Sequence, residues 1–153
     1  MQKFTIGISG DLLNKNGLPC FGETPLKKLY SRNDVELIWM PKDIDQISQD
    51  MSAKYDAILL NLPKATAESV ERDDCKLKII SRFGVGYDSV DIKAMKEKNI
   101  IVTNTPNAVR RPVAIAAMTM IFSLSGRIFE KDDLVRTGRW NERTDYMGLG
   151  LTK

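Results

Sequence analysis

The chain has 153 residues and is 42% hydrophobic, which is enough to build the core of one ordinary domain. Its 23 basic and 20 acidic side chains leave a formal charge of +3 and are interspersed along the sequence, so we expect no nucleic-acid partner. The two cysteines, Cys20 and Cys75, lie far apart and form neither a metal-spaced pair nor a disulfide framework. These features predict a globular cytoplasmic protein with reduced thiols and no bound metal.

The first two thirds of the chain alternate short apolar runs with amphipathic segments, a pattern typical of a parallel sheet with crossover helices. Each of five predicted strands is a nearly continuous apolar run, which suits a strand covered on both faces. The predicted strands lie near 4–9, 35–40, 55–61, 77–81 and 100–103, and the predicted helices at 25–31, 43–53, 65–72 and 90–98. Asp43 is expected to begin the second helix, and the segment 10–22 to form a loop. The expected fold class is α/β.

A glycine-containing turn, 82–91, connects the fourth strand to the fourth helix. Because Gly84 and Gly86 have no Cβ, the backbone can turn sharply there and point its N–H groups into a cleft, where a carboxylate or phosphate oxygen would bind. Arg82 lies at the end of the strand, and its planar guanidinium can donate two parallel hydrogen bonds to one carboxylate. The turn is therefore the first candidate for an anion site.

The same turn permits two other interpretations. Asp88 followed by Asp91 fits a helix N-cap with an acidic partner three residues later, which is a purely structural role. The glycine spacing also imitates a dinucleotide fingerprint, but Ser89 stands where the third glycine should be. About twenty residues further on, the segment 103–106 offers no acid for a ribose hydroxyl.

A long helix is predicted from about Pro112, a residue that the first turn of a helix tolerates. The segment 112–126 contains no charged side chain. As a helix it would span about 22 Å, short of the roughly 30 Å of a bilayer core, so we expect no membrane span. Its many small residues suit close packing against protein. A second helix is predicted at 130–138, closed by Gly138 and followed by a polar tail.

Four motifs occur in order along the second half of the chain: the turn 82–91, the segment 102–107, the small-residue helix, and the triplet 138–140. Together they closely resemble the D-isomer-specific 2-hydroxyacid dehydrogenases. Within that family, the phosphoglycerate dehydrogenase branch is the first to compare. The resemblance covers about 77–153, while the residues before it match only in strand–helix order. It implies a flavodoxin-like substrate domain and a Rossmann-type domain that binds NAD or NADP, with the active site between them.

The resemblance also implies how the chain is divided. Residues 1–104 would be the substrate domain, 105–145 a helical link and dimer surface, and 146–153 the lead-in to a Rossmann domain absent from this chain. The family's catalytic arginine, glutamate and histidine come from positions after Lys153, and this sequence contains no histidine. We therefore expect the chain alone to be inactive and to bind no NAD or NADP tightly. Because the uncharged long helix would keep an apolar face without a Rossmann domain to cover it, we also expect at least a homodimer.

Carried over position by position, the resemblance assigns the substrate carboxylate to the backbone N–H groups of Val85 and Gly86, with Val85 also near the nicotinamide. Arg82 would help to hold a second anionic group such as a phosphate. After the third strand, Asn61 and Lys64 could add a polar or basic contact. The expected ligand is a small 2-hydroxy or 2-oxo acid.

Some features stay open at this point. Arg110 and Arg111 begin the long helix and could attract a phosphorylated substrate or cofactor, or could simply face water. The chain could also be a stand-alone flavodoxin-like module that binds a small anion or a partner without catalysis. A receiver-type module needs an acidic pocket at the strand ends, and after the first strand the sequence offers only Asp11 for it. A third hypothesis is a dimeric scaffold built on the long helix.

Overall fold

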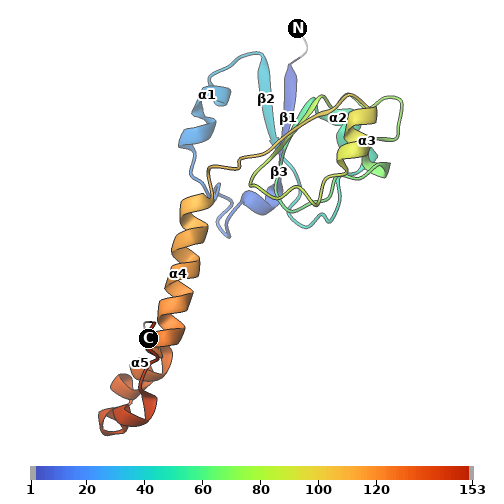
Figure 1. Ribbon diagram of the computed structural model, residues 1–153. Helices are drawn as coiled ribbons and strands as arrows, with labels where there is room; N and C mark the ends of the chain where they lie inside the picture. The colour runs from blue at the N-terminus through green and yellow to red at the C-terminus, as the bar shows by residue number, and fades with distance from the viewer. Residues whose placement is uncertain (1–2, 152–153) are drawn as a thin grey trace. The chain divides into compact units, whose positions relative to one another are not determined.

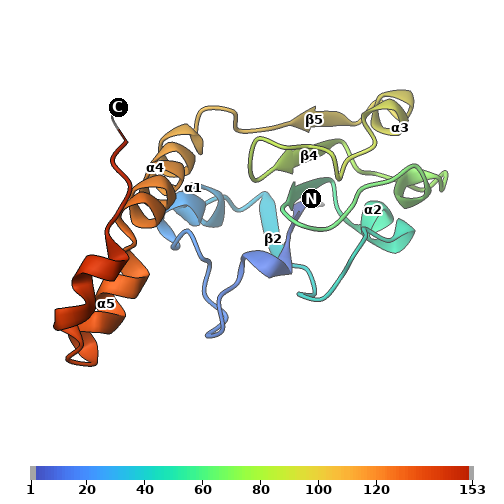
Figure 2. The same cartoon turned by 60° about the horizontal axis from the view of Figure 1, so that its bottom comes forward.

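The computed structural model describes residues 3–151, and the chain divides into two compact units, Met1–Asn107 and Ala108–Lys153. The first unit contains a five-stranded parallel sheet, whose strands appear in Figures 1 and 2. They are β1 (Phe4–Ile8), β2 (Val35–Trp39), β3 (Ala57–Leu60), β4 (Ile79–Arg82) and β5 (Ile101–Thr103). The order β2-β1-β3-β4-β5 is that of a doubly wound, flavodoxin-like sheet. The predicted fold class and all five predicted strands are confirmed, with strand ends shifted by one or two residues.

Short helices connect these strands. The α-helices are α1 (Lys27–Tyr30), α2 (Gln49–Lys54) and α3 (Ile92–Glu97), and the 3-10 helices are η1 (Gly10–Leu12), η2 (Thr24–Leu26) and η3 (Glu68–Val70). The helix predicted for 25–31 is thus divided between η2 and α1. The loop predicted for 10–22 contains η1 and an antiparallel bridge between Leu13 and Pro19.

Alternate residues of the central strands point into two separate apolar clusters, which explains the continuous hydrophobic runs in the sequence. Ile58 and Leu60 of β3 are buried in the larger cluster, which also contains Met95 of α3. Leu59 of β3 packs against the smaller cluster, together with Leu29 of α1. Figure 1 shows α1 on one side of the sheet and α2 and α3 on the other. The sheet is therefore the middle layer of three.

Two predicted helix starts are wrong because backbone pairing keeps the chain extended there. Ala65 N donates to Ser89 O and Asp91 N donates to Ala65 O, both at 2.8 Å, so 65 and 90 form a parallel bridge. Ala65 therefore cannot begin a helix, and the predicted helix 65–72 is reduced to η3. The bridge also displaces the expected N-cap at Asp88. Helix α3 begins instead after Asp91, whose carboxylate accepts a hydrogen bond from Ala94 N at 3.0 Å.

Asp43 does not begin α2, contrary to the prediction. The segment 45–47 pairs with Lys64, which donates to Asp45 O at 2.8 Å and accepts from Ile47 N at 2.9 Å. This pairing holds the segment outside the helix. The helix begins after Ser48, whose hydroxyl accepts a hydrogen bond from Met51 N at 3.3 Å and so caps the first turn.

The second unit consists of α4 (Arg110–Gly126), α5 (Ile128–Arg136) and the 3-10 helix η4 (Trp140–Tyr146). No residue of α4 is buried in this chain, and Arg110 and Arg111 are exposed in its first turn without a side-chain cap. Arg127, at φ +50°, separates α4 from α5. Within the described residues no single helix is long and apolar enough to cross a membrane, and only α4 and α5 joined across a 60° bend reach that length and composition.

Candidate functional site

The carboxyl ends of the parallel strands bring the candidate side chains to one edge of the sheet. Asp11 follows β1, Asn61 follows β3, and Arg82 is the last residue of β4. In a doubly wound sheet, ligands bind outside the carboxyl ends of the strands where the strand order reverses. In this sheet that point lies between β1 and β3, so Asp11 and Asn61 flank it.

Three polar side chains form a connected network at this edge. Asn61 Nδ2 donates to Asp11 Oδ2 at 2.5 Å, and Leu62 N donates to the same oxygen at 3.2 Å. Because Asp11 fixes the amide group, Asn61 Oδ1 is turned toward Arg82 and accepts from its Nη1 at 3.3 Å. Among the described residues, Asp11 Oδ1 and Arg82 Nε are buried atoms without a hydrogen-bond partner. The network therefore has unused hydrogen-bonding capacity at both ends.

The structure brings Asn61 and Arg82 together, as a shared site requires, but it does not bring Lys64 to them. Lys64 is exposed and has no side-chain hydrogen bond or ion pair with residues 3–151. Asp11 is a site residue that the sequence reasoning considered only for a receiver-type pocket. The signal that could have identified it is its position within a few residues of the end of an apolar strand, at the same edge of the sheet as Asn61.

Gly84 is the residue that the turn after β4 requires. Its φ of +147° lies in the region that favours glycine, and a Cβ there would be 2.9 Å from Arg82 Nη1. Gly86 has no positive φ, and its Cβ position is nearly open, with Asp88 Oδ2 at 3.7 Å as the nearest atom. The expectation that both glycines shape the turn is therefore right only for Gly84.

The carbonyl groups of Phe83, Gly84 and Val85 accept hydrogen bonds, whereas two amides of the turn have no partner among residues 3–151. Thr105 N donates to Gly84 O and Asn104 Nδ2 donates to Val85 O, both at 2.9 Å. Arg82 Nη1 donates to the carbonyl of Phe83. The N–H groups of Val85 and Gly86 donate no hydrogen bond to any residue in 3–151, and both residues are exposed. The turn thus contains two adjacent N–H groups that have no partner among residues 3–151 and that belong to exposed residues.

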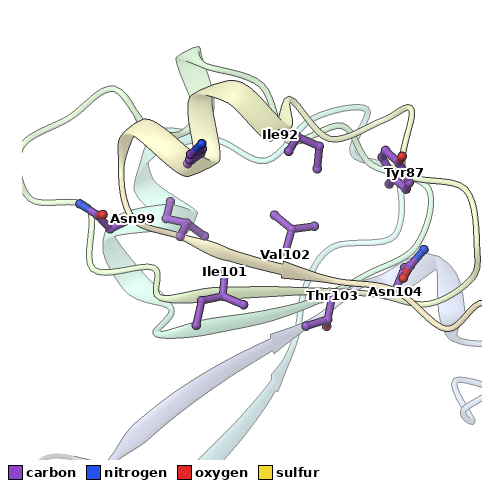
Figure 3. A pocket seen from close by; sticks show the side chains of 9 residues that line it. Tyr87, Ile92, Asn99, Ile101, Val102, Thr103 and Asn104 are labelled. Carbon is purple, nitrogen blue, oxygen red and sulfur yellow. The ribbon is translucent and has the colours of Figure 1, made fainter.

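A cavity of about 600 Å³ lies beside this turn, between β5 and α3 (Figure 3). Val102 and Ile92 point toward each other across it, and Tyr87 and Asn104 stand at the end nearest the turn. Val85 and Gly86 are not among its lining residues. The described residues contain no group of three or more His, Cys, Asp or Glu side chains that could hold a metal ion.

The fold and this edge define a doubly wound α/β domain with exposed amide donors at the carboxyl ends of its strands. The family model for the D-isomer specific 2-hydroxyacid dehydrogenase catalytic domain matches residues 14–123. The chain therefore belongs to the D-isomer specific 2-hydroxyacid dehydrogenase family, as the four motifs predict.

Two relatives illustrate this membership, and one solved structure illustrates the shared fold. A glyoxylate/hydroxypyruvate reductase A from Arabidopsis thaliana is 44% identical over 115 residues, covering 75% of this chain and 37% of the relative. A D-3-phosphoglycerate dehydrogenase from Archaeoglobus fulgidus is 34% identical over 141 residues, covering 92% of this chain and 23% of the relative. The crystal structure of D-lactate dehydrogenase from Aquifex aeolicus, complexed with NAD and lactic acid, has a TM-score of 0.66 and 23% identity, covering 89% of this chain and 38% of that one. The chain thus spans less than half of each protein.

We expect Asp11→Ala to destabilise the first unit by about 1–3 kcal/mol, because the change leaves the Asn61 amide and the Leu62 N–H without their acceptor. Asp11→Asn keeps one acceptor oxygen at the same place, so its loss should be smaller. Urea unfolding followed by circular dichroism measures both. Equal stability of the two variants and the wild type would show that the network contributes nothing to folding.

Proposed function

We propose that this chain is the substrate-binding portion of an NAD(P)-dependent D-2-hydroxyacid dehydrogenase, similar to phosphoglycerate dehydrogenase. The intact enzyme transfers a hydride between nicotinamide and a small 2-hydroxy or 2-oxo acid. The observation that carries the proposal is the pair of adjacent N–H groups of the exposed residues Val85 and Gly86, which have no partner within residues 3–151, in a chain that belongs to this family. Backbone N–H groups of this kind suit a carboxylate, because they offer fixed donors to a concentrated negative charge.

The turn and the side chains beside it give the anionic groups of the ligand their partners. The amides of Val85 and Gly86 hold the carboxylate. Arg82, fixed by Asn61 through the 3.3 Å hydrogen bond, places a positive charge beside them and would bind a further anionic group such as a phosphate. Asn61 acts through Arg82 and is itself oriented by Asp11.

NAD or NADP is the proposed cofactor, and it supplies the hydride acceptor or donor when bound. The described residues offer it only one candidate contact, Val85, and no glycine-rich cradle for a pyrophosphate. They therefore do not form a dinucleotide site, and we expect no tight NAD(P) binding by the chain alone. We propose residues 1–104 as the substrate domain, 105–145 as the link and dimer surface, and 146–153 as the lead-in to a Rossmann domain. With both cysteines free, the protein is proposed to work in the cytoplasm.

Binding of a 2-oxo acid can be tested directly on the ¹⁵N-labelled chain. Titration with glyoxylate should shift the amide resonances of Val85 and Gly86 saturably, with a Kd on the order of 1 mM because only half of the site is present. Arg82→Gln should weaken this binding by removing the charge, while the neutral analogue acetamide should leave both resonances unmoved. A scaffold without a ligand site would show no saturable shift for either amide.

The chain should not catalyse the reaction by itself. Carbonyl reduction needs a proton donor and a positive charge that polarises the carbonyl, and the family's histidine has no counterpart in a sequence without histidine. NADH oxidation in the presence of glyoxylate or hydroxypyruvate should therefore stay at the buffer rate. Turnover by the purified chain would contradict this part of the proposal. A coding frame that continues past residue 153 into a glycine fingerprint and a histidine would support the dehydrogenase over the stand-alone module.

Helix α4 supports a homodimer. Its exposed apolar side chains are Val113, Ile115, Met118, Met120, Ile121, Phe122 and Leu124. An apolar surface of this kind is stable in water when a second copy covers it. Sedimentation velocity at micromolar concentration should give a dimer, and the double variant Ile115→Glu/Phe122→Glu should give a monomer. Leu18→Glu, which changes an exposed leucine in the first unit, should stay dimeric. A monomeric wild type would refute the dimer.

A further inference from the structure

A basic cavity lies at the amino-terminal edge of the sheet, the opposite edge from the candidate substrate site. Its volume is about 570 Å³, and its walls come from the starts of β1 and β4, from Asp56 before β3, and from the residues after α3. Four lysines line it: Lys3, Lys76, Lys78 and Lys98. Nothing in the dehydrogenase proposal uses this cavity.

The positive charge of the cavity is only slightly compensated. Asp56 is the one acid in its lining, and its Oδ2 already accepts a hydrogen bond from Thr5 N at 2.9 Å. Lys78 Nζ stands 4.0 Å from Asp56 Oδ1, a loose pair in which the lysine side chain is 70% exposed. Within residues 3–151, neither Lys3 nor Lys76 has an ion pair, and Lys98 Nζ donates to the backbone carbonyl of Glu71 at 2.8 Å. The lining therefore carries an excess of three positive charges.

This arrangement fits a ligand with several closely spaced negative charges. Like charges gathered around one concavity reinforce one another's potential. Lysine ammonium groups act as point charges that bind phosphate oxygens from several directions. A cavity of this size also accommodates a small molecule. We propose that the cavity binds a polyphosphate group, carried either by a nucleotide or by an inorganic polyphosphate.

The alkylation rates of the two cysteines can report binding of a ligand in this cavity. Cys75 is partly buried in the lining of the cavity, whereas Cys20 is exposed in the segment after β1, outside it. Alkylation by iodoacetamide can be followed at each cysteine by mass spectrometry, with and without tripolyphosphate at constant ionic strength. Tripolyphosphate should slow alkylation of Cys75 about tenfold at tenfold excess over its Kd and leave Cys20 unchanged. Equal slowing at both cysteines, or none at Cys75, would overturn the proposal.

Variants of the lysines test whether the cavity itself is the site. Lys76→Gln should weaken tripolyphosphate binding about fivefold in calorimetry, and Lys3→Gln should do the same if Lys76→Gln fails to fold. Lys28→Gln removes the same charge from α1, outside the cavity, and should leave binding unchanged. An equal loss in Lys28→Gln would refute a specific site. ATP binding tighter than tripolyphosphate would identify a nucleotide as the ligand, and equal binding would identify the phosphate chain alone.

Discussion

Gly10→Ala should leave the first unit largely unfolded. A Cβ at this position would lie 2.2 Å from Met40 O and 2.6 Å from Pro41 O, and both are backbone atoms that cannot rotate away. The strand ends of β1 and β2 would have to separate, which should cost more than about 4 kcal/mol out of the 5–15 kcal/mol that stabilises a typical domain. Circular dichroism during urea unfolding should show a midpoint far below that of the wild type.

Gly86→Ala is the matched control for this variant, because it adds the same methyl group where the nearest atom lies at 3.7 Å. Its free energy of unfolding should stay within about 0.5 kcal/mol of the wild type. If Gly10→Ala proved as stable as Gly86→Ala, the prediction would be wrong. The backbone at Met40 and Pro41 would then be able to move away from the added methyl group at little cost.

Gly84→Ala should cost about 1–3 kcal/mol and abolish the binding of glyoxylate. Alanine is strained at φ +147°, and its Cβ would be 2.9 Å from Arg82 Nη1, so both the turn and the guanidinium must shift. The amides of Val85 and Gly86 then lose their orientation. Unfolding in urea measures the first effect, and the ¹⁵N titration with glyoxylate measures the second.

The stability of Gly86→Ala again serves as the comparison, since Gly86 has no positive φ and an alanine there introduces no backbone strain. A Gly84→Ala variant that keeps wild-type stability and still shifts the Val85 resonance with glyoxylate would show that the turn conformation is not what presents the amides.

The strands were predictable because burial on both faces forces continuous apolar runs, as with Ile58, Leu59 and Leu60. Helix starts were less predictable. Asp43 and Asp88 are plausible caps by residue type, but the pairing of 45–47 with Lys64 and of Ala65 with Val90 keeps the chain extended. Such pairing joins segments that are distant in sequence, so no local pattern reveals it.

The site was predictable where its residues belong to a local motif. Arg82, Gly84 and Val85 lie in one turn whose glycine spacing is visible in the sequence, and their roles in substrate binding remain predictions. Asp11 was missed as a partner of Asn61, because the residues are fifty positions apart and only the parallel arrangement of β1 and β3 brings their ends together. The need for glycine at 10 likewise follows from contact with Met40, which the sequence does not show.

The pairing of Gly84 O and Val85 O with Thr105 and Asn104 also determines which sign of charge the turn selects. A cation approaching these two oxygens would compete with the hydrogen bonds that they already accept, which makes them poorer ligands for Mg²⁺ or Ca²⁺. The N–H groups of Val85 and Gly86, which have no partner within residues 3–151, carry a positive partial charge that repels such ions and attracts carboxylates. The preference for anions over cations therefore comes from backbone groups. It should persist when the side chain of Val85 is replaced.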